Sequence, residues 1–293
     1  MSRRQWLGGV LLALLGGAAL GLGYIFRPRP TVALPKLPSR SLVVAYLKVG
    51  QGEASWIKTP EGQFMVIGAG PPGSGAHVAE SLRAAGAQQI DLLVLPYPYS
   101  EAIGSATELI KQFPVKSVLD LGWERVNKSQ EETLTLLRKQ RVLVQLARSG
   151  VAFNLGTEGH VKILYPGERL ISRTPAAANN SVVLRLTWGK TSFLWEGGLE
   201  EPGEQALLSM GHELSADVLR VARFGNAGAS SPELLRQVQP RFVVISSDDK
   251  EKHLPAPATL ERLIATGATI LRTDQERGDI FFFSDGQRVE LAR

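Results

Sequence analysis

The chain has 293 residues, of which 44% are apolar, which is enough to bury the core of one large or two small domains and excludes a disordered protein. Lysine and arginine number 33 against 28 acidic residues, with no clustered basic stretch, so charge alone gives no support for nucleic acid as a partner. The absence of cysteine excludes disulfides, thiolate metal sites and cysteine nucleophiles.

Residues 1–26 form an apolar leader that begins M-S-R-R-Q-W-L and carries no further charge. This start resembles a twin-arginine export signal. A run of about 20 uncharged residues is just long enough to cross a hydrocarbon core of about 30 Å, and no clean A-x-A-like cleavage site follows it. We therefore expect a single N-terminal membrane anchor, with the domain on the exported side of the cell membrane. Secretion after signal cleavage is the alternative.

Residues 27–40 are rich in proline and predict an extended linker. The folded domain is expected over 41–293. It opens with three short β-rich runs separated by turn residues, which predict an antiparallel meander.

Helix-period and strand-like runs alternate after the meander, as in βα units. The predicted helices cover 77–85, 103–113, 130–140, 203–210, 232–239 and 259–265. The predicted strands cover 91–95 and 116–121, lie near 142, 161 and 182, and then cover 191–195, 218–221, 242–246 and 269–271, before a final hairpin. A meander followed by helices thus occurs twice. This pattern predicts an α/β fold of two mixed sheets packed face to face with helices outside.

Seven landmarks follow one another along the domain. They read K-V-G-Q-G-E-A, F-M-V-I-G-A-G, L-P-Y-P-Y-S-E-A-I-G, N-N-S-V-V-L-R-L, F-L-W-E-G-G-L-E, V-L-R-V-A-R-F-G-N and V-V-I-S-S-D. In this order and spacing they resemble the metallo-β-lactamase domain at the C-terminus of ComEC-type DNA-uptake channels. The resemblance runs from about Ser41 to the end, and it implies a four-layer αββα sandwich.

In that family a T-H-P-H-A-D-H-I-G segment supplies a zinc-type site through three histidines and an aspartate. The resemblance places Tyr97, Tyr99, Glu101 and Ala102 at these four positions. A neutral imidazole binds Zn²⁺ through a nitrogen lone pair, whereas a phenol must first lose a proton with a pKa of about 10. The family's histidine ligands are therefore absent from this segment.

The other metal-binding positions that the resemblance marks are also changed. Gly68 stands where the family has the aspartate of L-I-D-G-G, and Gly198 stands where it has the bridging aspartate of T-G-D-L. Arg223 lies in the segment that corresponds to G-H-H-G. Hydrolysis in such proteins needs a metal to lower the pKa of the reacting water. We therefore expect no metal, no cofactor and no catalytic residue, and a vestigial cleft at these positions.

Three carboxylates, Glu53, Glu101 and Glu196, are expected near this cleft. Together they could bind a hard ion such as Mg²⁺ or Ca²⁺. The favoured interpretation is that they are solvated residues at the rim and that Arg223 pairs with one of them in place of a metal. The two tyrosines are expected to fill the space that imidazoles leave, with stacking on a ligand as the alternative.

Three histidines, His77, His160 and His212, lie away from every landmark and are expected to be surface residues. The sequence therefore predicts a pseudoenzyme, exported or membrane-anchored, that acts by binding in envelope or DNA-uptake-related processes. The alternative is a metal-dependent hydrolase of phosphodiesters with a rebuilt carboxylate metal site.

Overall fold

The computed structural model describes residues 34–123, 128–171, 177–250 and 253–292. The chain divides into two compact units, Met1–Ala33 and Leu34–Arg293, and every described residue belongs to the second. The predicted leader and the first half of the predicted linker therefore lie outside the described residues. Within the described ranges, no helix combines the length and the apolar character that crossing a bilayer requires.

The first sheet has eight strands in the order β15-β14-β1-β2-β3-β4-β5-β6. These strands are β1 (Leu42–Tyr46), β2 (Ser55–Lys58), β3 (Phe64–Ile67), β4 (Ile90–Leu95), β5 (Val115–Asp120), β6 (Leu143–Leu146), β14 (Ile280–Ser284) and β15 (Val289–Leu291). Strands β1 to β3 form the antiparallel meander, and β3 to β6 run parallel. The T-P-E-G turn between β2 and β3 supplies the proline and glycine that such a reversal favours.

The second sheet has seven strands in the order β13-β12-β11-β10-β9-β8-β7. These strands are β7 (Ala152–Leu155), β8 (Gly159–Tyr165), β9 (Val183–Trp188), β10 (Thr191–Trp195), β11 (Val218–Arg220), β12 (Phe242–Ile245) and β13 (Thr269–Arg272). Strands β7 to β10 are antiparallel neighbours, and β10 to β13 run parallel.

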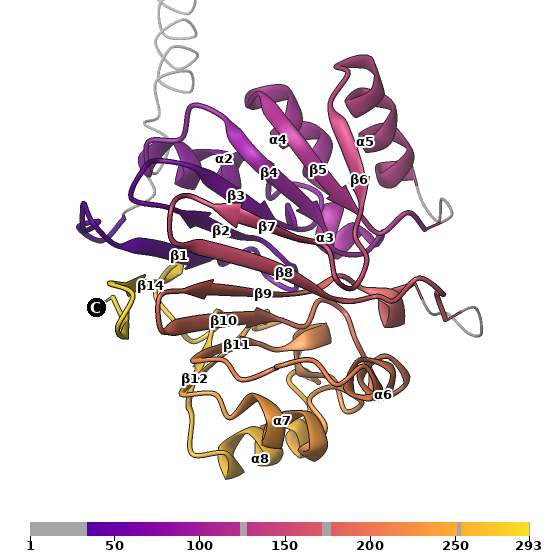
Figure 1. Ribbon diagram of the computed structural model, residues 1–293, viewed down its shortest axis with the longest axis vertical. Helices are drawn as coiled ribbons and strands as arrows, with labels where there is room; N and C mark the ends of the chain where they lie inside the picture. The colour runs from indigo at the N-terminus through magenta and orange to yellow at the C-terminus, as the bar shows by residue number, and fades with distance from the viewer. Residues whose placement is uncertain (1–33, 124–127, 172–176, 251–252, 293) are drawn as a thin grey trace, which may run out of the picture. The chain divides into compact units, whose positions relative to one another are not determined.

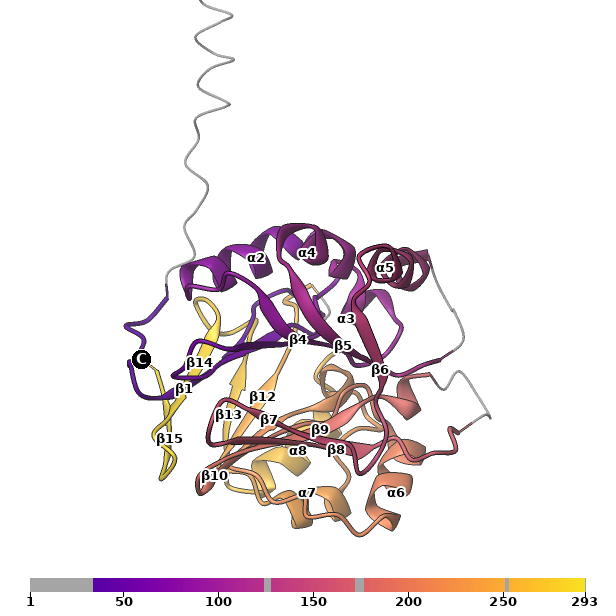
Figure 2. The same ribbon diagram turned by 45° about the horizontal axis from the view of Figure 1, so that its top comes forward.

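The helices lie on the outer faces of the two sheets (Figures 1 and 2). The helices of the first half are α2 (Gly75–Ala84), α3 (Ser100–Ile103), α4 (Ala106–Gln112) and α5 (Lys128–Lys139). The second half has α6 (Glu201–Ser209), α7 (Pro232–Val238) and α8 (Pro257–Ala265), with short 3₁₀ turns η1 (Ala178–Asn180) and η2 (Ala222–Gly225). Figure 2 shows α2, α4 and α5 on one side of the paired sheets and α6, α7 and α8 on the other. The expected αββα sandwich is therefore confirmed.

The apolar core follows the same layers. A central cluster joins the facing sides of the two sheets, with Val44 and Met65 from the first and Leu186 and Phe193 from the second. Two further clusters join each sheet to its own helices. Both faces of the inner strands are therefore buried, which explains why these strands read as continuous apolar runs in the sequence.

The structure departs from the predicted elements mainly at the edges of the sheets. Strand β7 was not predicted, because A-F-N-L is short and follows a glycine turn without a clear alternation. Strand β6 is an edge strand whose four residues are all exposed, with Leu143 at 58% and Leu146 at 55%. The other predicted helices and strands are present, with ends shifted by a few residues.

Candidate functional site

The predicted cleft residues come from loops that follow β3, β4, β10 and β11. In each sheet the two neighbouring strands run parallel, so their carboxyl ends lie at the same edge. A backbone bond from Val182 N to Pro96 O, 2.8 Å long, joins the two halves there. The structure brings together Gly68, Tyr97, Tyr99, Glu101, Ala102, Glu196, Gly198 and Arg223, with Glu53 from the loop between β1 and β2.

Tyr97 fills the space beside Gly198. The Tyr97 side chain is 1% exposed, and a Cβ added to Gly198 would lie 3.2 Å from the Tyr97 ring and 3.0 Å from Ser181 Oγ. The amide of Gly198 donates to that same Ser181 hydroxyl at 2.9 Å. The rings of Tyr97 and Tyr99 meet edge to face, with centroids 6.0 Å apart. A side chain at position 198 would therefore require Tyr97 and Ser181 to shift.

Gly68 is closed to any side chain. Its φ is +69°, in the left-handed region, and an added Cβ would lie 2.1 Å from the carbonyl oxygen of Glu53. Ala102, fully buried, accepts a backbone hydrogen bond from Ala69 at 2.7 Å on the other side of this turn. An aspartate could occupy position 68 only if the backbone around Glu53 moved.

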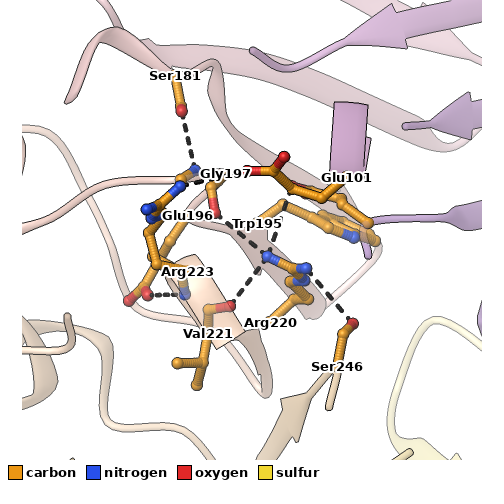
Figure 3. A network of polar contacts seen from close by, with 12 residues as sticks. Glu101, Ser181, Trp195, Glu196, Gly197, Arg220, Val221, Arg223 and Ser246 are labelled. Carbon is orange, nitrogen blue, oxygen red and sulfur yellow. Dashed lines mark hydrogen bonds and ion pairs between the residues drawn. The ribbon is translucent and has the colours of Figure 1, made fainter. Parts of the chain in front are cut away.

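Arg220, at the end of β11, supplies the positive charge of the centre (Figure 3). Its Nη1 lies 3.5 Å from Glu53 Oε2, and both side chains are 0% exposed. The guanidinium also donates to the carbonyls of Gly197 at 3.2 Å and Val221 at 3.0 Å, and it reaches Ser246 Oγ at 3.4 Å. A buried guanidinium therefore joins the β1–β2 loop of the first half to β10, β11 and β12 of the second.

Glu53 depends on this arginine. Burial raises the pKa of its carboxyl, while Arg220 and the nearby Tyr97 hydroxyl lower it. Among the described residues, no hydrogen-bond partner with ordinary geometry is present for either carboxylate oxygen of Glu53 or for the Tyr97 hydroxyl. The charge of Arg220 is thus the main compensation for a carboxylate taken out of water.

Two buried carboxyl groups, Glu196 and Glu204, accept hydrogen bonds from η2 and from the segment after it. Glu196 Oε2 accepts from the amide of Ala222 at 2.8 Å, and Glu204 accepts from the amides of Ser230 and, at 2.8 Å, Ser231. Burial is the larger cause and the negative charge of Glu204 the second; together they raise the pKa of Glu196 to about 8. At neutral pH this pair therefore carries less negative charge than two ordinary glutamates.

Arg223 lies nearer the surface and closes the rim. Its Nη1 lies 3.3 Å from Glu101 Oε1 and its Nε lies 3.4 Å from Glu200 Oε1. Both Arg223 and Phe224 adopt positive φ, at 45° and 59°, which non-glycine residues rarely do. These two residues line, with Glu101 and Asn226, a polar cavity of about 290 Å³. The cavity offers a cation, a carboxylate and an amide to a ligand.

The residues of this centre do not fit the divalent metal that the fold family implies. Gly68, Gly198 and Ala102 have no side-chain ligand atoms, and the Tyr97 ring occupies space beside Gly198. The buried cation Arg220 would repel a second cation at close range. In the part of the chain that the structure describes, no three His, Asp or Glu side chains are grouped so that they could hold a metal ion.

The predicted roles of the three carboxylates are partly wrong. Glu53 and Glu196 are fully buried rather than solvated, whereas Glu101 is partly exposed and pairs with Arg223 as expected. Sequence reasoning missed Arg220, which is the central cation. Its signal was available, because an arginine inside the apolar strand run V-L-R-V-A needs a buried counter-ion.

The three histidines lie outside this centre. His77 Nε2 is 2.8 Å from Asp279 Oδ1, and this hydrogen bond raises the pKa of His77. His160 bonds Asn154 at 2.8 Å and His212 bonds Ser149 at 2.7 Å. Within the described residues, none of these three histidines forms a hydrogen bond or ion pair with the residues around Arg220.

Comparison with known proteins identifies sequence relatives and solved structures of similar fold. No protein-family model matches the chain. The chain is 31% identical to ComE operon protein 3 of Bacillus subtilis over 197 residues, which are 66% of this chain and 25% of that protein. It is 26% identical to competence protein ComA of Neisseria gonorrhoeae over 242 residues, which are 81% of this chain and 32% of that protein. The chain thus spans about a quarter to a third of the length of these relatives.

Solved structures agree in fold. The metallo-β-lactamase fold protein YhfI from Bacillus subtilis matches 79% of this chain and 95% of its own at a TM-score of 0.52 and 10% identity. Zn²⁺-bound PqqB from Methylobacterium extorquens matches 79% of this chain and 97% of its own, at a TM-score of 0.51 and 10% identity. At 10% sequence identity, these matches show a shared fold and nothing about function. The chain therefore has the metallo-β-lactamase fold, and its sequence is similar to part of ComE operon protein 3 and of competence protein ComA.

Proposed function

We propose that this chain is a catalytically degenerate metallo-β-lactamase-fold protein that acts by binding and needs no metal. The observation that carries the proposal is the buried ion pair between Arg220 and Glu53, at the point where Gly198 and Tyr97 meet. In a hydrolase of this class, a metal ion would supply positive charge and activate water. A guanidinium can supply the charge, but it activates no water in this way.

The charge balance of the centre supports the proposal. Two buried carboxyl groups, Glu53 and Glu196, surround Arg220, and each is also influenced by its positive charge. Replacing the arginine by a divalent ion would require new ligands that Gly68 and Gly198 cannot give. The interior is therefore complete as a structural unit without an ion.

Binding is assigned to the rim of the same centre. The cavity of about 290 Å³ around Arg223 lies in a partly exposed position, and its ion pairs are the kind that a ligand can replace at small cost. A ligand could therefore replace the carboxylate partners of Arg223 without disturbing the buried residues around Arg220.

The names of the relatives support a proposal for the process. One relative is named a competence protein and the other a ComE operon protein, so we propose that this chain acts in DNA-uptake-related or other envelope processes. The apolar leader over residues 1–26 would hold the domain on the exported side of the cell membrane, or direct its secretion if the leader is cleaved.

A metal and activity assay tests the proposal against a carboxylate-built hydrolase. The full chain, purified in detergent, is supplied with Zn²⁺, Mn²⁺ or Mg²⁺, and bound ions and phosphodiester turnover are measured. We expect no tightly held ion and no turnover. One ion per chain, with turnover abolished by Glu101→Ala but kept in the surface control Glu108→Ala, would establish the hydrolase instead.

Export is tested separately. Replacing Arg3 and Arg4 with lysine should trap the protein in the cytoplasm if the leader is read as a twin-arginine signal. Cell fractionation of this variant and the parent measures the effect. An unchanged location would remove the twin-arginine route.

A further inference from the structure

The outer face of the second sheet carries a cavity that the proposed function does not use. Its volume is about 490 Å³, and its walls come mainly from the three neighbouring strands β7, β8 and β9. The polar side chains around it are Asn154, His160, Lys162, Arg185, Thr187 and Glu213. It shares no lining residue with the cavity around Arg223. Figure 1 shows these three strands side by side.

Two cations lie side by side in the wall of this cavity. Lys162 on β8 is the direct partner of Arg185 on β9 in the antiparallel ladder. Directly opposite residues of such a ladder have Cβ atoms about 4.5–5.5 Å apart on one face of the sheet, and like charges there destabilise the pairing. The next residue across from Lys162 on the edge strand is Ala152, which offers no compensating charge.

The carboxylates of the region are directed to other partners. Glu213 Oε1 accepts from the amide of Ser215 at 3.1 Å. Asp217 accepts from the amide of Ser192 at 2.9 Å and lies 3.5 Å from Arg241. Within the described residues, neither Lys162 nor Arg185 forms an ion pair with a carboxylate.

Arg185 is already oriented by the fold. Its Nε donates to the carbonyl of Ser215 at 2.7 Å, and its Nη1 donates to Thr187 Oγ1 at 2.9 Å. Burial lowers the pKa of Arg185, while the charges of Glu213 and Asp217 raise it. The positive charge of Lys162 also contributes, after burial, to a lowered pKa of His212. Lys162 and Arg185 are like charges at directly opposite ladder positions, so an anion bound beside both would lessen their repulsion.

We propose that this cavity binds a small phosphate-bearing molecule, with Lys162 and Arg185 contacting the same phosphate group. A phosphate presents several oxygens in a tetrahedral arrangement, which suits cations approaching from two strands, and Lys and Arg are its usual partners. The hydroxyl of Thr187, which accepts from Arg185, and the amide of Asn154 can donate to further oxygens. The site is independent of the proposed function of the Arg220 centre.

Titration with inorganic pyrophosphate tests the site. The full chain in detergent is titrated calorimetrically, beside Lys162→Gln and the matched control Lys111→Gln, an exposed lysine of α4 in the other half. We expect saturable binding of one pyrophosphate, weakened about tenfold or more by Lys162→Gln because a charge-assisted hydrogen bond is lost, and unchanged in Lys111→Gln. Absent binding, or equal weakening in both variants, would overturn the proposal.

A charge reversal separates a binding cation from a structural one. In Lys162→Glu, the new carboxylate faces Arg185, so the melting temperature should rise while pyrophosphate binding disappears. Pyrophosphate should raise the melting temperature of the parent and leave that of the variant unchanged. A lower melting temperature for Lys162→Glu without ligand would assign Lys162 a structural role and contradict the proposal.

Discussion

Two arginines three residues apart show how burial changes the meaning of an ion pair. Arg220 and its partner Glu53 are both 0% exposed, whereas Arg223 and its partner Glu101 are 28% and 23% exposed. Solvent cannot reach the inner pair to replace a lost partner, whereas it can reach the outer pair. Removing one partner of a buried pair is strongly destabilising, while an exposed pair contributes about 0–1 kcal/mol. The inner pair is therefore part of the scaffold, and the outer pair is free to serve a ligand.

The largest expected effect is the loss of the inner cation. Arg220→Met should lower the free energy of unfolding by about 3–5 kcal/mol, because Glu53 is left buried without its counter-ion. Urea denaturation measures the change. The double variant Arg220→Met/Glu53→Gln should recover part of it, and a loss below 1 kcal/mol in the single variant would remove the contrast between the two arginines.

The second-largest expected effect is the pH dependence that Glu196 gives to the free energy of unfolding. Its folded pKa of about 8 lies above its ordinary value of 4.5, so its stabilising contribution is full below pH 4.5 and is lost as the pH rises through about 8. Glu196→Gln cannot ionise, so relative to the parent it should gain on the order of 3 kcal/mol between pH 5 and pH 9.

Denaturation of both proteins at several pH values checks this expectation. The comparison with the parent is needed because burial also raises the pKa of Glu53 and Asp120. A constant difference between the two proteins across this pH range would contradict a buried, titrating Glu196.

An intermediate case lies between α2 and the loop before β14. The His77 and Asp279 side chains are 35% and 3% exposed, and the hydrogen bond to Asp279 raises the pKa of His77 above 6.5. This contribution is full below pH 6.5 and is lost as the pH rises through the folded pKa. His77→Gln should therefore cost about 1 kcal/mol at pH 6 and less at pH 9.

Thermal unfolding at the two pH values measures this difference. His160→Gln is the matched control, because His160 bonds the uncharged Asn154. Equal losses for His77→Gln at both pH values would show that the charge of His77 does not contribute.

The smallest expected effect belongs to the outer arginine. Arg223→Gln should change the free energy of unfolding by less than about 1 kcal/mol, since its two carboxylate partners remain hydrated. Urea denaturation beside Arg220→Met gives the comparison directly. A loss as large as that of Arg220→Met would mean that the rim is also part of the scaffold.

Much of the fold could be predicted from the sequence because local pattern and burial agree. The turn W-G-K gave the β9–β10 hairpin, and the apolar runs gave the parallel strands β4, β11 and β12. Strand β7 was missed because its pairing with β8 is decided by tertiary contact rather than by its own four residues.

The candidate site was predicted less completely than the fold. The resemblance indicated positions 68, 97, 198 and 223, and the structure brings them together. It could not indicate Arg220 as the partner of Glu53, because the pair joins residues from different halves of the chain. The sequence predicts Glu196, at the end of the apolar run F-L-W, as a rim residue, whereas the segment with Ala222 and Ser230 packs over it and buries it.

Because Arg220 is covalently part of the chain, the positive charge at the heart of the sandwich has no dissociation constant. It cannot be stripped by a chelator, exchanged for a competing ion or diluted away in a metal-poor fluid. This positive charge is therefore present as soon as the polypeptide is made, whatever ions its surroundings contain.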